Sequence, residues 1–246
     1  MRARRTVAVA AATLAVALAG AVTVDSVNAS RVEADVSTRI RPATPGVPAP
    51  SVMLGGGPTA RWTGPGTLES ASIRVEGVTR PGLGPVAVEA LVTDLHLPAD
   101  RSADMTAVVE RVAVQITGDA LGPALGMRDV LVGGADDPSL AGGVEHRARV
   151  TGTLEGTDTR VSAEVDLVVD DRGAHLVPIT AATGPSGLPD QDPDLALRRT
   201  ALTLSPELLP LGVAVETLTV RGGTITAGGT GAPGTTPLGG LARPDH

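Results

Sequence analysis

Alternation of apolar and polar residues runs through most of this chain and predicts a protein built mainly of β-strands. The clearest case is residues 144–154 followed by residues 161–169, where alternate positions are apolar and most of the others are charged or hydroxylated. With a turn around Gly156, these segments predict a long antiparallel hairpin with one apolar and one solvated face. The Gly222-Gly223 pair predicts a second hairpin. Counting outward from it pairs Val220 with Ile225 and Leu218 with Ala227.

Two further strands are predicted within residues 52–75, on either side of a loop. The first strand runs into the Gly-Gly-Gly-Pro break at 55–58, and the second resumes after Gly66. The loop between them carries Trp62. Core packing is one interpretation of this ring; the other is an amphipathic residue at the mouth of a cavity or at a membrane surface. The apolar residues of the two strands include Met53, Leu54, Leu68, Ile73 and Val75.

The phase of the apolar positions changes within residues 86–97. A change of phase inside one strand predicts a β-bulge or a strong bend, which a curved sheet requires. Residues 105–116 fit two periods, because 105–112 have helical spacing and 112–116 alternate; we predict a helix that turns into a strand near Arg111. Within residues 86–97, the apolar residues of the first phase are Val86, Val88, Ala90 and Val92, and those of the second are Leu95 and Leu97.

Helical periodicity is confined to short segments. Residues 26–40 place Val32, Val36 and Ile40 four residues apart among charged residues, which predicts a helix. The prolines between 42 and 50 make that stretch an extended connector. A short helix is predicted for residues 194–204.

The N-terminus has the composition of an export signal. Three arginines precede residues 6–24, which carry no charge and consist mainly of Ala, Val and Leu. Such a segment is typical of a cleaved signal peptide or of an uncleaved anchor, since about 20 apolar residues can span a bilayer. At the other end, the tail rich in Gly, Thr and Pro predicts disorder. We therefore divide the chain into a signal segment (1–25), one domain (26–229) and a disordered tail (230–246), and expect an exported protein of the cell envelope.

Composition excludes several classes of function. The chain has no cysteine and no lysine, which excludes thiol nucleophiles, disulfides, and phosphate-binding or Schiff-base lysines. Trp62 is the only aromatic residue, and the formal net charge is -7. A nucleic-acid-binding role is excluded on these grounds, because it needs positive charge and usually stacking rings.

The candidate catalytic and metal-binding motifs are incomplete. Residues 190–194 begin like a calcium loop, but Leu195 stands where glycine is needed and Ala201 where glutamate is needed. Residues 184–188 lack the closing glycine of a nucleophile elbow. The four histidines have no ligand spacing, and we interpret His146 as a hydrogen-bonded core residue. We therefore predict no catalytic residue, no metal and no cofactor, and a protein that is not an enzyme.

Three short motifs recur in a recognisable order: Val52-Met-Leu-Gly-Gly-Gly-Pro58, Gly66-Thr-Leu68 through Ile73-Arg-Val75, and Leu209-Pro-Leu-Gly212 through Val220-Arg-Gly-Gly223. With these motifs the chain resembles the LmeA-type phospholipid-binding proteins of the actinobacterial cell envelope, over most of residues 26–229. One feature departs from that pattern: bulky apolar residues usually follow the Gly-x-Pro motif, whereas Thr59-Ala-Arg-Trp62 follows it here.

This resemblance implies an α+β, β-dominated fold. A curved antiparallel sheet would wrap around one or two helices, similar to half of a tubular lipid-binding (BPI-like) module, with an apolar cavity for acyl chains. The implied partner is phospholipid at the outer face of the cytoplasmic membrane, and the sequence does not identify a protein partner. The alternative is a structural or scaffolding envelope protein without a ligand. The residues expected to line the lipid site are Met53, Leu54, Trp62, Leu68, Ile73, Val75, Leu211 and Val213.

Overall fold

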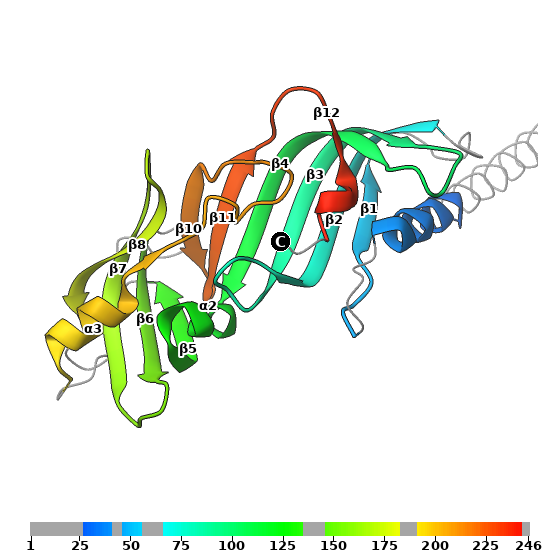
Figure 1. Ribbon diagram of the computed structural model, residues 1–246. Coiled ribbons are helices and arrows are strands. Elements are labelled where there is room, and N and C mark those ends of the chain that lie inside the picture. The colour runs from blue at the N-terminus through cyan, green and yellow to red at the C-terminus, as the bar shows by residue number, and fades with distance from the viewer. Residues whose placement is uncertain (1–26, 41–45, 56–65, 135–145, 183–190, 243–246) are drawn as a thin grey trace, which may run out of the picture.

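The computed structural model describes residues 27–40, 46–55, 66–134, 146–182 and 191–242, and contains two antiparallel sheets (Figure 1). The first has seven strands in the order β1-β2-β3-β4-β11-β10, with β12 also paired to β4, and the second has the order β5-β6-β7-β8-β9. This confirms the β-dominated α+β class and adds a second sheet that the sequence did not predict.

The strands of the first sheet are β1 (Ser51–Gly55), β2 (Gly66–Thr79), β3 (Pro85–Leu97), β4 (Thr106–Thr117), β10 (Thr217–Arg221), β11 (Thr224–Thr230) and β12 (Thr235–Pro237). The strands of the second are β5 (Met127–Gly134), β6 (Arg147–Leu154), β7 (Arg160–Asp170), β8 (Gly173–Ala181) and β9 (Leu202–Thr203). The helical elements are residues 27–40, α2 (Gly118–Leu125), α3 (Pro193–Thr200) and the 3-10 helix η3 (Leu238–Gly240).

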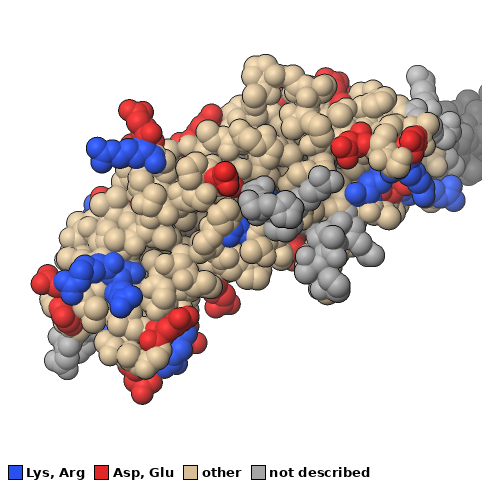
Figure 2. All heavy atoms as spheres, viewed as in Figure 1, with Lys and Arg blue, Asp and Glu red and all other residues tan. Residues whose placement is uncertain are grey.

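The seven-stranded sheet is strongly curled (Figure 1). Its inner face is lined by short aliphatic side chains. Strand alternation places these side chains, apart from Leu68, on one face, where they are buried. Over the side of the molecule seen in Figure 2, charged side chains gather at the two ends and the middle is mostly uncharged. The inner face comprises Leu68, Ala71, Ile73, Val75, Val88, Ala90, Val92, Val112, Val114, Ile116, Leu218, Val220, Ile225 and Ala227.

Three segments, called here the covering segments, contribute buried side chains to the same core. They are the N-terminal helix (27–40), residues 204–213 and residues 235–242. The helix is joined to the β1 end of the sheet, where the Glu33 carboxylate accepts from the Leu54 backbone N–H at 3.3 Å. The Ser37 hydroxyl donates to the Pro50 carbonyl at 2.6 Å. The buried side chains of the covering segments are Val32, Val36, Ile40, Leu204, Leu208, Leu209, Val213, Leu238 and Leu241.

Register changes explain one correct and one wrong prediction. The phase change in β3 coincides with a shift in its pairing to β4 between Thr93 and His96, and the predicted bulge is confirmed. The helix predicted for 105–112 is wrong, because Thr106–Thr117 is a single strand. Relative to β3, β4 has one extra residue: Leu91 pairs with Arg111, but the next residue, Val92, pairs with Val109. Val109 and Val112 therefore both face the core at a spacing of three, which imitates a helical period.

The other predicted elements are mostly present. Residues 27–40 form a helix, and β6 pairs with β7 as the long predicted hairpin. The Gly222-Gly223 hairpin has the predicted register, with Val220 opposite Ile225 and Leu218 opposite Ala227. The C-terminal segment differs from the predicted disorder, since residues 235–240 form β12 and η3. Its two leucines, Leu238 and Leu241, are fully buried, and this apolar content outweighs the Gly/Pro-rich composition.

Within the described ranges, none of the helices is long and apolar enough to cross a membrane. The apolar stretch 6–24, for which export was predicted, lies outside the described residues.

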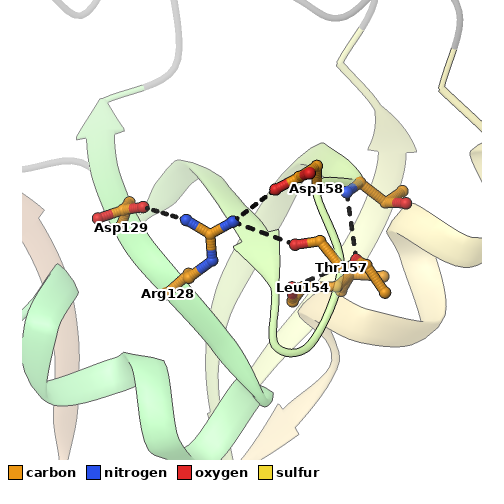
Figure 3. A network of polar contacts seen from close by, with 6 residues as sticks. Arg128, Asp129, Leu154, Thr157 and Asp158 are labelled. Atoms are coloured by element: carbon orange, nitrogen blue, oxygen red, sulfur yellow. Dashed lines mark hydrogen bonds and ion pairs between the residues drawn. The ribbon is translucent and has the colours of Figure 1, made fainter.

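An arginine on β5 connects the bulged part of that strand to the β6–β7 turn (Figure 3). Arg128 Nη2 donates to the Thr157 carbonyl at 3.1 Å and lies 3.0 Å from the Asp158 carboxylate, while Nη1 lies 3.3 Å from Asp129. Asp129 has a positive φ of 53° and sits where the β5–β6 register shifts. Because these contacts are exposed to solvent, they contribute little stability.

The joint between the two sheets requires a glycine at position 118. Gly118 begins α2 directly after β4, and a Cβ there would overlap the Val130 carbonyl oxygen of β5. Gly133, also on β5, has no atom within 4 Å of an added Cβ. These two glycines form a matched pair with opposite steric surroundings.

We expect Gly118→Ala to lower the free energy of unfolding by more than about 2 kcal/mol, because the backbone of β5 must move to relieve the overlap. Gly133→Ala should change it by no more than about 0.5 kcal/mol. Urea unfolding followed by circular dichroism measures both. Equal effects of the two substitutions would contradict the close packing of α2 on β5.

Candidate functional site

Three of the predicted lipid-site residues lie together on β2. Leu68, Ile73 and Val75 all face the inner side of the seven-stranded sheet and are buried. Ala71, between them, faces the same side. The structure thus brings these residues onto one apolar wall. Trp62 lies outside the described residues.

On β1, alternate residues separate to opposite faces. Val52 is buried and Leu54 packs against the core, whereas Met53 is 68% exposed on the outer face. Met53 pairs with Ser72 of β2, and Ser72 pairs with Leu91 of β3, which is also exposed. The structure therefore does not bring Met53 together with the other predicted residues. Val52 occupies the inward position that the sequence reasoning missed, although alternation from Leu54 indicates it.

The remaining two predicted residues belong to the second covering segment. Val213 is buried, and Leu211 is partly buried against the core. Leu211 has a φ of 62°, which is unusual for a residue with a bulky side chain. Its Cδ2 lies beside Gly240, where an added Cβ would come within 3.3 Å. Leu211 is therefore the point at which the second and third covering segments meet.

A buried arginine holds the C-terminal covering segment. Arg80 follows β2 and is only 1% exposed, and its Nη2 donates to the Leu241 carbonyl at 3.3 Å. Burying a guanidinium is costly unless its donors are satisfied, so this position is strongly constrained. The local sequence gives no signal for this role, because it depends on a contact with a residue 161 positions away.

A second group of polar side chains surrounds a groove of about 410 Å³ at the β7–β8–β9 edge of the five-stranded sheet. His175 Nδ1 lies 3.2 Å from the Thr203 hydroxyl, and Nε2 lies 3.2 Å from Asp170 Oδ1. The Arg172 backbone N–H donates to the same carboxylate oxygen at 2.8 Å. Arg172, Val168, Val177 and Pro178 also line the groove.

The sequence reasoning missed this group because Asp170, Arg172 and His175 form no recognised motif, and Thr203 lies 28 residues from His175 in the chain. His175 and Thr203 come together only through the pairing of β8 with β9, and β9 has two residues. The Arg172 backbone N–H holds the pKa of Asp170 below its ordinary value, and the His175 imidazole acts in the same direction. A carboxylate, an imidazole and a hydroxyl are therefore kept in fixed positions beside a cationic side chain.

Two residues weighed for chemistry from the sequence have structural roles. The Asp192 side chain caps α3 by accepting from the backbone N–H groups of Asp194 and Leu195, as expected of an acidic turn. His146 is exposed rather than buried, and its Nδ1 lies 3.2 Å from the Leu218 carbonyl of the other sheet. The predicted hydrogen bond is present, but the core location is wrong. Among the described residues, no three potential metal ligands lie close enough to hold an ion.

Comparison with known proteins gives one result. The family model described as LmeA-like phospholipid-binding matches residues 23–230, which is most of the chain. Neither the curated proteins nor the solved structures gave a match.

The two faces of the β1–β2 region should respond differently to truncation. Ile73→Ala removes a fully buried side chain and should cost about 2–5 kcal/mol of unfolding free energy. Met53→Ala, on the exposed face, should cost no more than about 0.5 kcal/mol. Chemical denaturation of both variants measures the difference, and a large loss for Met53→Ala would contradict its outward orientation.

The lowered pKa of Asp170 predicts a pH-dependent contribution to stability. Because the folded-state pKa lies below the ordinary value of 3.8, the charge stabilises the fold above about pH 4 and this contribution is lost as the pH falls through the folded-state pKa. Asp170→Asn should therefore be less stable than the parent at pH 6, and the gap should narrow near pH 3. Denaturation midpoints at both pH values measure it. Asp171→Asn controls for loss of one negative charge in the same turn, and a gap that does not change with pH would contradict the assignment.

Proposed function

The chain belongs to the LmeA-like phospholipid-binding family, and from that premise we propose that it is an exported cell-envelope protein that holds a phospholipid and shuttles it without chemical change. Export is supported by residues 1–24, in which arginines precede an uncharged apolar stretch. The outer face of the cytoplasmic membrane is then the source and destination of the lipid.

The observation that carries this proposal is the inner face of the curled sheet. Its wall consists of Val, Ala, Leu and Ile side chains, which offer an acyl chain contact without any polar group to desolvate. Burial of each methylene is favourable by roughly 0.8 kcal/mol, so a long chain is held without any specific bond. No nucleophile is needed for this function.

The packing of the inner face indicates how a lipid would enter. Ile73, Val88 and Val114 are fully buried, so an acyl chain must displace a covering segment rather than the hydrogen-bonded strands. The contact between Leu211 and Gly240 is the boundary between two covering segments. The left-handed backbone of Leu211 stores strain there that movement would release. We therefore assign the opening to residues 204–213 and 235–242.

A second candidate function is supported by the same packing. In a scaffolding envelope protein, the whole inner face of the sheet would be covered by the protein's own side chains, leaving no room for a ligand. The complete burial of Ile73 and Val88 is consistent with this. The two functions differ in whether the covering segments exchange with lipid.

Native mass spectrometry of the full chain, purified in mild detergent, tests the proposal. We expect a phospholipid adduct that survives gentle activation, and organic extraction should recover the same lipid. A ligand-free spectrum together with no uptake of a fluorescent phospholipid would favour the scaffolding function.

Trp62 supplies an independent optical test, since it is the only aromatic residue in the chain. If its loop guards the lipid site, its emission should shift to the blue and resist aqueous quenchers when phospholipid is added. Trp62→Ala should then weaken lipid uptake and change stability by no more than about 1 kcal/mol. An emission that is already blue, does not respond to lipid, and accompanies a loss of about 3–5 kcal/mol in the variant would instead place Trp62 in the core.

A further inference from the structure

A protein that exchanges phospholipid with a membrane must contact that membrane through some part of its surface. We propose that the outer face of β8 and the adjoining groove form this docking surface, and that the groove receives the headgroup of a zwitterionic aminophospholipid of the bilayer. The inference rests on the proposed function only in that a lipid carrier needs such a contact.

Two exposed branched side chains mark the surface. Val177 and Ile179 on β8 are 44% and 42% exposed, on the side of the sheet that carries the groove histidine. Ile179 lies where the pairing of β7 with β8 shifts, so the strand bulges at this residue. Neighbouring exposed aliphatic residues on an otherwise polar face are typical of contact with an apolar phase.

The charges that face this surface from β7 are already balanced. Asp166 pairs with Arg147 at 2.9 Å, and Glu164 pairs with Arg149 at 3.1 Å. The carboxylates beneath Val177 and Ile179 therefore present little net negative charge to an approaching bilayer.

The groove itself contains both signs of charge. Arg172 forms no ion pair with any residue in the described ranges, and its guanidinium matches the oxygens of a phosphodiester. The Thr203 hydroxyl lines the same groove and supplies a further polar contact. Asp170 uses Oδ1 for the Arg172 backbone and His175, and its negative charge suits an ammonium group. The exposed Asp171 in the same turn adds to this preference.

A headgroup that carries a phosphodiester and an amine complements this arrangement better than an anionic one. With an overall net charge of -7, the protein is repelled by an anionic membrane surface. A phosphoethanolamine group avoids that repulsion, because it carries no net charge and can contact Arg172 and Asp170 together. Val177 and Ile179 then lie at the level of the glycerol and upper acyl region.

The test uses the full chain with a single reporter, since the protein has no cysteine of its own. Thr180→Cys places an environment-sensitive fluorophore beside Ile179, and Leu91→Cys places it on the outer face of the other sheet as a control. Leu91 is 47% exposed, which is close to the 42% of Ile179. Vesicles contain phosphatidylcholine alone, or with added phosphatidylethanolamine or phosphatidylglycerol, and a lipid-borne quencher reports contact with the bilayer.

We expect the label at position 180 to be quenched at least about threefold more than the label at 91, and most strongly with phosphatidylethanolamine. Val177→Ser with Ile179→Ser should abolish the difference between the two labels. Arg172→Gln should weaken the contact, and Asp170→Asn should remove the preference for the amine. Equal quenching of both labels overturns the docking surface, and a preference for phosphatidylglycerol overturns the headgroup assignment.

Uptake of a short-chain phospholipid below its micelle concentration separates this inference from the proposed function. Ile179→Ser alone should retain that uptake, because Ile179 does not line the groove and belongs to the five-stranded sheet rather than to the inner face of the seven-stranded one. If uptake fails in the parent while quenching at position 180 persists, the docking surface stands and the lipid-carrier function fails. If uptake succeeds and quenching at position 180 is absent, the reverse holds.

Discussion

The packing of short aliphatic side chains against one curled sheet is the interaction on which this structure depends. A chain without phenylalanine or tyrosine cannot fill its centre with a few large rings. It uses many Val, Ala, Leu and Ile side chains instead, each contributing a small amount of buried area. Such a core is sensitive to register, because a slip of one residue would move a whole row of these side chains to the outer face. The bulges in β3 and β4 and the glycine at the sheet joint keep those rows aligned along strands that must bend.

Much of this fold follows from alternation in the sequence. The register of the β10–β11 hairpin and the bulge in β3 could be predicted because a turn or a phase change marks each of them locally. The helix predicted for 105–112 failed for a related reason: a bulge in β4 converts alternation into a spacing of three. The C-terminal strand and η3 were missed because their stability comes from burying Leu238 and Leu241 against distant residues, and local composition carries no sign of that.

The candidate sites were predictable to different degrees. Ile73 and Val75 share a face, as their spacing of two on one strand requires. Leu68 is buried out of that phase, three residues before Ala71, so alternation alone does not explain its burial. Met53 lies on the opposite face because it stands between the inward residues Val52 and Leu54 of β1. Arg80 and the His175 groove could not be found from the sequence, since each depends on a contact between segments remote in the chain: Arg80 with Leu241, and His175 with Thr203. Absence of a local motif therefore says little about polar groups that strand pairing assembles.

The position of β4 has a consequence for the order in which the molecule is completed. Its neighbour β3 precedes it directly, but its other neighbour, β11, is synthesised only after the whole five-stranded sheet, and the register joins Thr117 to Thr224. Until then β4 has an open edge, and such long-range pairing is slow to form. The remaining length of the same edge pairs with β12. The apolar wall of β2, β3 and β4 therefore stays uncovered along one side until residues 224–237 have been synthesised.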